Sequence, residues 1–560
     1  MDTETPPARL RITVLQQYPV NGKAVGKLAE AAYAWLEANK QTVNALNVFP
    51  VPDGDTGTNM VLTMKSAVEE MRKVPETKAG EMLAALAQGA LMGARGNSGV
   101  ILSQLWRGFA RSVDGKESLN SQDMAQAFVA ARDTAYKGVV RPVEGTILTV
   151  AKDMAAAAEG AANEGTDPIR LLRRVWQAAK ESVQRTPELL PILKQAGVVD
   201  SGGKGLSLLM EGMLRWVEGH QLHTAETIAQ PIAAMNLEAA TESVEEGQDY
   251  EVVVDFRPHQ ELDLPSFYSD LEKMGTSIQV GEGQDIYRMH IHVPADKRND
   301  PLDYIETIGT WTNVKMENLI SQMEEIKSKT RGQPLKLAAV KPGEIAVVAV
   351  ASGSGIARHF GELGAAAVVE GGQTMNPSTA DLLAAFENLP TDKIIILPNN
   401  KNILMAANSA AELTAKKAIV IPSTSIPEGF AAMLRHNPKG ELDAVVKEMK
   451  DSIAEVQTGE ITTATRDVEI DAVKVKVGQT IGLHNDELVI AAEDVEKACL
   501  KLLKQMKAED YEAITLFYGE DLHSEQATAI ADSIRKAYPK KEVDVHEGGQ
   551  PFYQFILSVE

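Results

Sequence analysis

The residues best suited to chemistry lie in one short string, NVFPVPDGDTGTNM, at positions 47–60. Asp53 and Asp55 are separated by a single glycine, in a turn that Pro52 and Gly54 restrict and bend. Two carboxylates on one tight loop supply the hard oxygen ligands that Mg²⁺ needs when it is bound to phosphate. Taken alone, the string equally fits an exposed turn in which Asp55 caps the next helix, a common use of aspartate.

Small and polar residues follow the two aspartates and lead directly into the apolar helical run MVLTM. A helix that begins at this point directs free backbone N–H groups toward any anion beside the carboxylates. Phosphate contacts are therefore expected from Thr56, Gly57, Thr58 and Asn59.

A second interruption of the helical pattern, GARGNSGVILSQ, spans residues 93–104. Small residues let backbone amides approach phosphate oxygens, and a serine adds a hydroxyl donor. In isolation the string also fits a plain turn between helices with an Asn or Ser cap. The candidate phosphate contacts here are Gly96, Asn97, Ser98 and Gly99.

The net charge of −22 excludes a protein that coats nucleic acid or anionic lipid, because both need a basic surface. The sequence contains no G-x-x-x-x-G-K-[ST] motif and no convincing G-x-G-x-x-G loop. If this chain handles a polyphosphate, metal cations must supply the positive charge locally.

The 560 residues exceed what one hydrophobic core organises, so several domains are expected. Helical periodicity dominates residues 1–222, and an acidic linker follows at 223–249. Residues 250–335 predict a small α+β domain, with a helix over 312–329. Residues 336–560 alternate short apolar runs with helices, which predicts a parallel-sheet α/β domain with its loops at the strand ends.

Two features bear on the compartment. The chain has no apolar stretch near the ~20 residues of a membrane-spanning helix, and its beginning lacks the layout of a secretory signal. Its one cysteine, Cys499, lies beside leucines at helical spacing and is expected to be a small buried hydrophobe. These features predict a cytoplasmic protein with no integral membrane segment.

In the string YRMHIHV, His290 and His292 alternate along a predicted strand and so point to one face. This spacing is able to chelate zinc.

The 47–60 string resembles the metal-binding loop of the dihydroxyacetone-kinase L-type nucleotide-binding family, and its N-V-F-P-V-P form resembles the catalytic subunit of bacterial fatty acid kinases. The resemblance covers the whole chain. It implies an all-helical barrel for the first domain, ATP as cofactor, and two Mg²⁺ ions held by Asp53 and Asp55, with Asn47 as a third candidate ligand. It also implies that Thr146, Asp200 and Gly202 approach the nucleotide.

The same resemblance bears on the rest of the chain. Family members pair the two strand histidines with a cysteine from an earlier strand, where this sequence has Glu251. Glu251 either replaces the thiolate as a zinc ligand, or the site is empty and the histidines belong to a polar hydrogen-bonded cluster. The last domain, 336–560, resembles DegV-type lipid-binding proteins. The family implies a homodimer and a separate DegV-type carrier that delivers the fatty acid and docks on this last domain.

The predicted function is phosphorylation of a fatty acid carboxylate by ATP to give acyl phosphate for phospholipid synthesis. A carboxylate is already a nucleophile and needs no base, and no histidine precedes His220. Two alternatives stay open: a kinase for dihydroxyacetone or another small hydroxyketone, and a nucleotide-binding regulatory or scaffold protein without turnover.

Overall fold

The computed structural model describes residues 20–47, 54–139, 141–220, 222, 230–231, 249–260, 262–282, 287–318, 335–372, 375–464, 468–470 and 473–560. By its internal contacts the chain divides into two compact units. The middle unit is Thr224–Pro334, and the larger unit joins a helical segment, Met1–His223, to an α/β segment, Leu335–Glu560.

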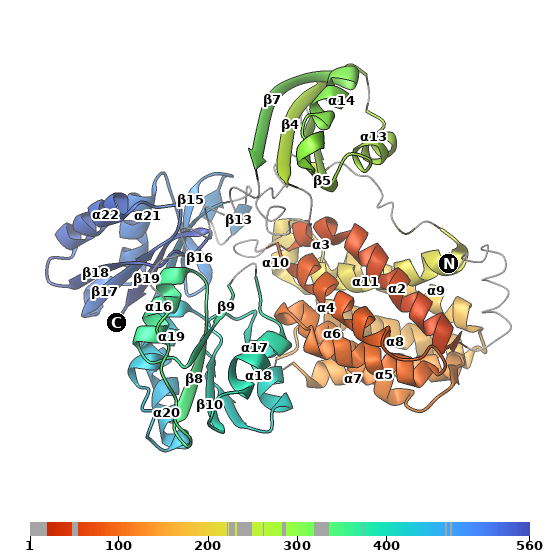
Figure 1. The fold of residues 1–560 in the computed structure, drawn as a ribbon, viewed down its shortest axis with the longest axis horizontal. Helices are drawn as coiled ribbons and strands as arrows, with labels where there is room; N and C mark the ends of the chain where they lie inside the picture. The colour runs from red at the N-terminus through yellow and green to blue at the C-terminus, as the bar shows by residue number, and fades with distance from the viewer. Residues whose placement is uncertain are drawn as a thin grey trace. The chain divides into compact units, whose positions relative to one another are not determined.

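The helical segment consists of helices joined by short loops, as its periodicity predicts (Figure 1). Consecutive long helices pack on one another, and α11 packs back against α2. Trp35, Leu36, Met60 and Met64 are among the side chains fully buried between them. The helices are α2 (Gly22–Ala38), α3 (Lys40–Leu46), α4 (Thr56–Met71), α5 (Ala79–Met92), α6 (Gly96–Ser112), α7 (Ser121–Lys137), α8 (Ile147–Asn163), α9 (Pro168–Leu189), α10 (Pro191–Ala196) and α11 (Ser201–Glu218), with a two-stranded sheet of β1 (Val20–Asn21) and β2 (Ser118–Leu119).

The described residues of the middle unit form a sheet of strand order β3-β5-β6-β4-β7 together with helices, which matches the predicted mixture of strands and helices. The helix predicted over residues 312–329 is wrong where it is described, because Gly309–Asn318 forms strand β7. Val314 and Met316 alternate along β7 and pack against the core. The two-residue apolar period of a strand therefore decides the structure here, over the helix propensity of the residues. The other elements are β3 (Gln230–Pro231), β4 (Tyr250–Pro258), α13 (Leu264–Leu271), β5 (Thr276–Glu282), β6 (Tyr287–Val293), η2 (Ala295–Lys297) and α14 (Asp300–Ile308). Of the linker predicted at 223–249, the structure describes residues 230–231 and 249.

The α/β segment begins with the predicted parallel sheet, of strand order β11-β10-β8-β9. Each strand is an apolar run followed by a polar loop, so the four loops gather at the carboxyl edge of the sheet. Its elements are β8 (Ile345–Ala351), α16 (Ser354–Glu362), β9 (Ala367–Glu370), α17 (Thr379–Glu387), β10 (Lys393–Leu397), α18 (Leu404–Leu413), β11 (Lys417–Val420), α19 (Ile426–Leu434) and α20 (Leu442–Ile453).

The rest of this segment departs from the prediction of one parallel sheet. A second sheet, of order β16-β15-β12-β19-β17-β18, is antiparallel except for the β17–β18 pair. Asn485 and Asp486 both take positive φ in the two-residue turn between β15 and β16, a hairpin geometry that forces antiparallel pairing. The elements are β12 (Gln457–Thr463), β13 (Val468–Ile470), β14 (Val473–Val475), β15 (Thr480–His484), β16 (Glu487–Ala492), α21 (Val495–Gln505), η3 (Ala508–Asp510), β17 (Ala513–Tyr518), α22 (Ser524–Ala537), β18 (Glu542–Glu547) and β19 (Tyr553–Val559).

Cys499 lies on α21 and is buried, as predicted, and burial raises the pKa of its thiol. No helix within the described part of the chain is long and apolar enough to cross a membrane.

Candidate nucleotide and metal sites

Asp55 directly precedes α4 and is only 6% exposed. Its side chain makes no capping hydrogen bond to that helix, so the alternative of an exposed Asp55 cap is wrong. Instead, its Oδ2 accepts a hydrogen bond of 2.5 Å from Nδ2 of Asn376, a residue 321 positions away. A carboxylate buried to this degree needs compensating partners, because desolvation penalises its charge.

The capping role that aspartate often performs falls here to Asn44, on α3. Asn44 Oδ1 accepts from the backbone N–H of Thr58 at 3.1 Å, and its Nδ2 donates to Thr58 Oγ1 at 3.1 Å. A Cβ atom on Gly57 would come within 2.3 Å of the carbonyl oxygen of Lys40, so only glycine lets α3 lie this close. Sequence reasoning did not single out Asn44, which sits within a short helix with no local signal of this contact.

The beginning of α6 lies against the beginning of α4. Gly96 starts α6 with a φ of 57°, a conformation that favours glycine. A Cβ at Gly96 would approach Asn59 Nδ2 to 2.5 Å, and one at Gly99 would approach Thr63 Oγ1 to 2.4 Å. The two glycine-containing strings singled out in the sequence therefore meet in space.

Two more helices begin at the same place. Ser201, the first residue of α11, donates from Oγ to Thr56 Oγ1 at 3.2 Å. A Cβ on Gly202 would lie 3.3 Å from Cβ of Ile147 at the start of α8 and 3.5 Å from Ser98 Oγ on α6. The N-termini of α4, α6, α8 and α11 thus converge, and each contributes backbone N–H groups and a partial positive charge that suit an anion such as a phosphate chain.

Asp200 and Thr146, predicted to approach the nucleotide, serve here as helix caps. Asp200 Oδ2 accepts from the backbone N–H of Gly203 at 2.6 Å, and Thr146 Oγ1 accepts from that of Leu148 at 3.4 Å. Burial raises the pKa of Asp200 to about 6, although the N–H groups of Gly203 and Ile147 partly oppose the shift. Direct contact of these two residues with a nucleotide stays a prediction.

Other predicted residues have different outcomes. Asp53 lies outside the described residues. Asn47 ends α3, where its backbone N–H donates to the carbonyl of Asn44 at 3.0 Å, and its role as a metal ligand stays a prediction. Asn97 is placed at the start of α6, but its Nδ2 donates to Asn402 Oδ1 of the α/β segment at 3.1 Å.

The residues present fit a magnesium–phosphate group. A buried carboxylate stands where four helix N-termini meet, and a second one nearby has a raised pKa. The N–H groups suit the phosphates, and the carboxylates suit the hard cation that accompanies them.

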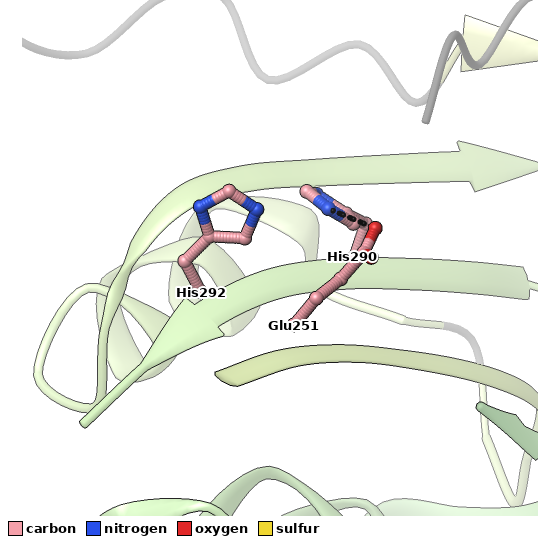
Figure 2. A group of neighbouring side chains, drawn as sticks. All are labelled: Glu251, His290 and His292. Carbon is pink, nitrogen blue, oxygen red and sulfur yellow. Dashed lines mark hydrogen bonds and ion pairs between the residues drawn. The ribbon is translucent and has the colours of Figure 1, made fainter. Parts of the chain in front are cut away.

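The second candidate site lies in the middle unit (Figure 2). Glu251 is on β4, and His290 and His292 are on β6, with 4%, 0% and 0% exposure. One ligand atom of each lies within 4.8 Å of the others. His290 Nε2 and Glu251 Oε1 form a hydrogen bond of 3.0 Å. The predicted alternation of the two histidines onto one face is confirmed.

Hydrogen bonding and electrostatics bear on whether this cluster could hold a cation. Neither ring nitrogen of His292 has a partner among the described residues, and Thr276 Oγ1, on the strand position opposite, also has none. Burial, and then His290, lower the pKa of His292 to about 4, so its ring is neutral. Burial opposes ionisation of Glu251, but the hydrogen bond with His290 and the charge of Lys315 keep its pKa below the usual value. Two imidazoles and a carboxylate are suitable zinc ligands.

Comparison with known proteins defines the class. A DAK2 domain model matches residues 50–215, and models of the FakA-like middle and C-terminal domains of fatty acid kinases match 247–326 and 346–560. Protein YloV of Bacillus subtilis is 40% identical over 550 residues, which cover 97% of this chain and 99% of that protein. An uncharacterized protein of Staphylococcus haemolyticus is 38% identical over 551 residues, with the same coverage. The chain belongs to the FakA-like family of fatty acid kinase proteins.

Solved structures resemble parts of the chain. A DegV family protein of Corynebacterium glutamicum is 17% identical, covers 39% of this chain and 96% of its own, and has a TM-score of 0.31. The dihydroxyacetone kinase of C. freundii in complex with AMP-PNP and Mg²⁺ is 16% identical, covers 39% of this chain and 37% of its own, and has a TM-score of 0.29. At these TM-scores neither likeness supports an argument about this chain.

Proposed function

We propose that this protein transfers the γ-phosphate of ATP to the carboxylate of a fatty acid, which a separate DegV-type carrier protein presents. The observation that carries the proposal is the meeting of four helix N-termini around the buried Asp55. It lies within the part of the chain that matches the DAK2 domain. The match of the other two parts to FakA-like domains of fatty acid kinases supports the fatty acid as substrate.

In this proposal the helix N-termini hold the phosphates, and Asp53 and Asp55, with Asn47, hold two Mg²⁺ ions. Magnesium would neutralise charge on the phosphates. The sequence has no P-loop motif whose lysine could do this instead. A carboxylate oxygen of the fatty acid forms a bond to the γ-phosphorus, and the bond to the β,γ-bridging oxygen breaks to release ADP. No proton transfer is required, which agrees with the absence of histidine before His220.

A second proposal concerns the middle unit, where Glu251, His290 and His292 would bind one zinc ion. The unpartnered nitrogens of the buried His292 support it, because an imidazole without a hydrogen-bond partner is unfavourable unless something else satisfies it. Such a buried ion would stabilise the unit.

The function is tested by mixing the purified protein with ATP, Mg²⁺ and a carrier loaded with a fatty acid, and by trapping acyl phosphate with hydroxylamine. Dihydroxyacetone replaces the loaded carrier in a parallel reaction. Acyl hydroxamate together with ADP supports the proposal. ADP formed only with dihydroxyacetone would instead support the small-hydroxyketone kinase, and ATP binding without ADP formation in either reaction would support a regulatory protein.

A further inference from the structure

The proposed phosphate site of the helical segment is in contact with two loops of the α/β segment. Arg95, just before α6, donates from Nη1 to the carbonyl of Asn376 at 3.0 Å and pairs through Nη2 with Asp381 at 3.2 Å. The backbone N–H of Thr379 donates to the carbonyl of Ala94 at 3.2 Å. These contacts join the loop after β9 to the turn that opens α6.

The loop after β10 meets the same turn through the Asn402–Asn97 hydrogen bond. Apolar packing supports both loops, since Ala94 and Val100 belong to the core cluster that contains Val348 and Val350 of β8. The carboxyl edge of the parallel sheet, where ligands commonly bind in α/β folds, is thus occupied by the phosphate loop of the helical segment.

Asn376 contacts the candidate metal ligand Asp55 directly. It is 2% exposed, and its Nδ2 donates to Asp55 Oδ2. Its Oδ1 is buried without a partner among the described residues, as is the nearby Thr379 Oγ1. Most buried amide oxygens in proteins are hydrogen-bonded, so an unpartnered one beside a predicted magnesium ligand requires an explanation.

The backbone of Asn376 is held on two sides. Its carbonyl accepts from Arg95 Nη1. Two residues further on, Ser378 and Asp381 form a reciprocal capping box at the start of α17.

We infer that Asn376 is a positioning residue of the magnesium–nucleotide site, contributed by the α/β segment, and that its amide both holds the Asp55 carboxylate and offers an oxygen to a bound cation. Nδ2 donates to Asp55 Oδ2, and Oδ1, which has no partner among the described residues, stays available to the cation. Amide oxygens, like carboxylates, are ligands for hard cations. This inference rests on the proposed function.

The test uses the full chain and measures two quantities: the Mg²⁺ concentration at the midpoint of AMP-PNP binding, by calorimetry, and the rise in melting temperature that Mg²⁺ and AMP-PNP produce. Asn376→Ala should raise the midpoint about tenfold, the scale of residues that orient metal ligands. Asn376→Asp should melt lower than wild type without Mg²⁺, because two carboxylates would face each other, and should gain more than wild type when Mg²⁺ is added.

Asn402→Ala is the matched control, because it removes a contact between the same two segments without touching Asp55. Its Mg²⁺ midpoint should equal that of wild type. If Asn376→Ala and Asn402→Ala shift the midpoint equally, or if neither Asn376 variant shifts it, the inference is overturned while the proposed function stands. If the wild-type protein binds no AMP-PNP at any Mg²⁺ concentration, the proposed function fails and the inference fails with it.

Discussion

The two candidate metal sites are built in opposite ways. Glu251, His290 and His292 come from two paired strands of one sheet, so all three candidate ligands lie within the middle unit. Asp55 stands among four helix N-termini and receives a hydrogen bond from a loop of the α/β segment. The first site depends on local geometry, and the second depends on how distant segments pack.

The two constructions suit different ligands. A cluster buried on all sides, with ligands fixed by a β-ladder, suits a cation that stays bound and stabilises the fold. A convergence of helix N-termini presents N–H groups to an anion and suits a nucleotide that binds and leaves. Changes at Asp55 should therefore alter turnover, whereas changes at His292 should alter stability.

The largest effect is expected for Asp55→Asn. This change keeps an acceptor for Asn376 but removes the charge that a cation needs, so acyl phosphate formation should fall by about 10³-fold or more. The melting temperature should change little, since Asp55 makes no capping bond. The matched control is Asp167→Asn, at a position where the side chain caps α9 and asparagine caps equally well. If Asp55→Asn and Asp167→Asn both form acyl phosphate at the wild-type rate, the Asp55 charge has no part in the reaction.

The next largest effect is expected for metal at the histidine cluster. The wild-type protein should contain about one zinc per chain by elemental analysis, and a chelator should lower its stability by about 2–4 kcal/mol, as for the loss of a ligand present at roughly 100 to 1,000 times its Kd. His292→Ala should lose the metal, whereas His259→Ala, at an exposed histidine of the same unit, should keep it. Because His292→Ala also leaves a cavity, metal content is the deciding measurement. Wild-type protein refolded with zinc that retains none would refute the site.

A smaller effect, dependent on pH, is expected for Asp200. Its pKa in the folded protein, about 6, lies above the ordinary 3.8, so the native state binds more protons between these values. Stability from this group is therefore present below pH 4 and is lost as pH rises through 6, by roughly 1–3 kcal/mol. Asp200→Asn keeps the cap without the charge. Urea unfolding should find this variant more stable than wild type at pH 7.5 and similar at pH 4. The same difference in unfolding free energy at both pH values would contradict a raised pKa for Asp200.

The sequence predicted some parts of these sites and not others, for physical reasons. Strand alternation placed His290 and His292 on one face, because a period of two is local information. The strings 47–60 and 93–104 predicted helix starts with small residues, and α4 and α6 begin there. The Asn376–Asp55 contact spans 321 positions and depends on packing between segments, which no local pattern encodes. The hairpin at Asn485 was not predicted, because the short apolar runs around it also fit a βα alternation.

The smallest effect is expected for Asn44, which caps α4 in place of Asp55. Asn44→Ala removes the acceptor for the Thr58 N–H, so stability should fall by about 1 kcal/mol, as for other N-cap losses. Asn44→Asp retains the acceptor and should recover most of this stability in urea unfolding. Turnover should fall severalfold in Asn44→Ala, since the first turn of α4, which orients Asp55 and Thr56, would be less fixed. If Asn44→Ala loses neither stability nor activity, another group accepts the hydrogen bond of the Thr58 N–H. Asn44 would then not be the residue that leaves Asp55 free of a capping role.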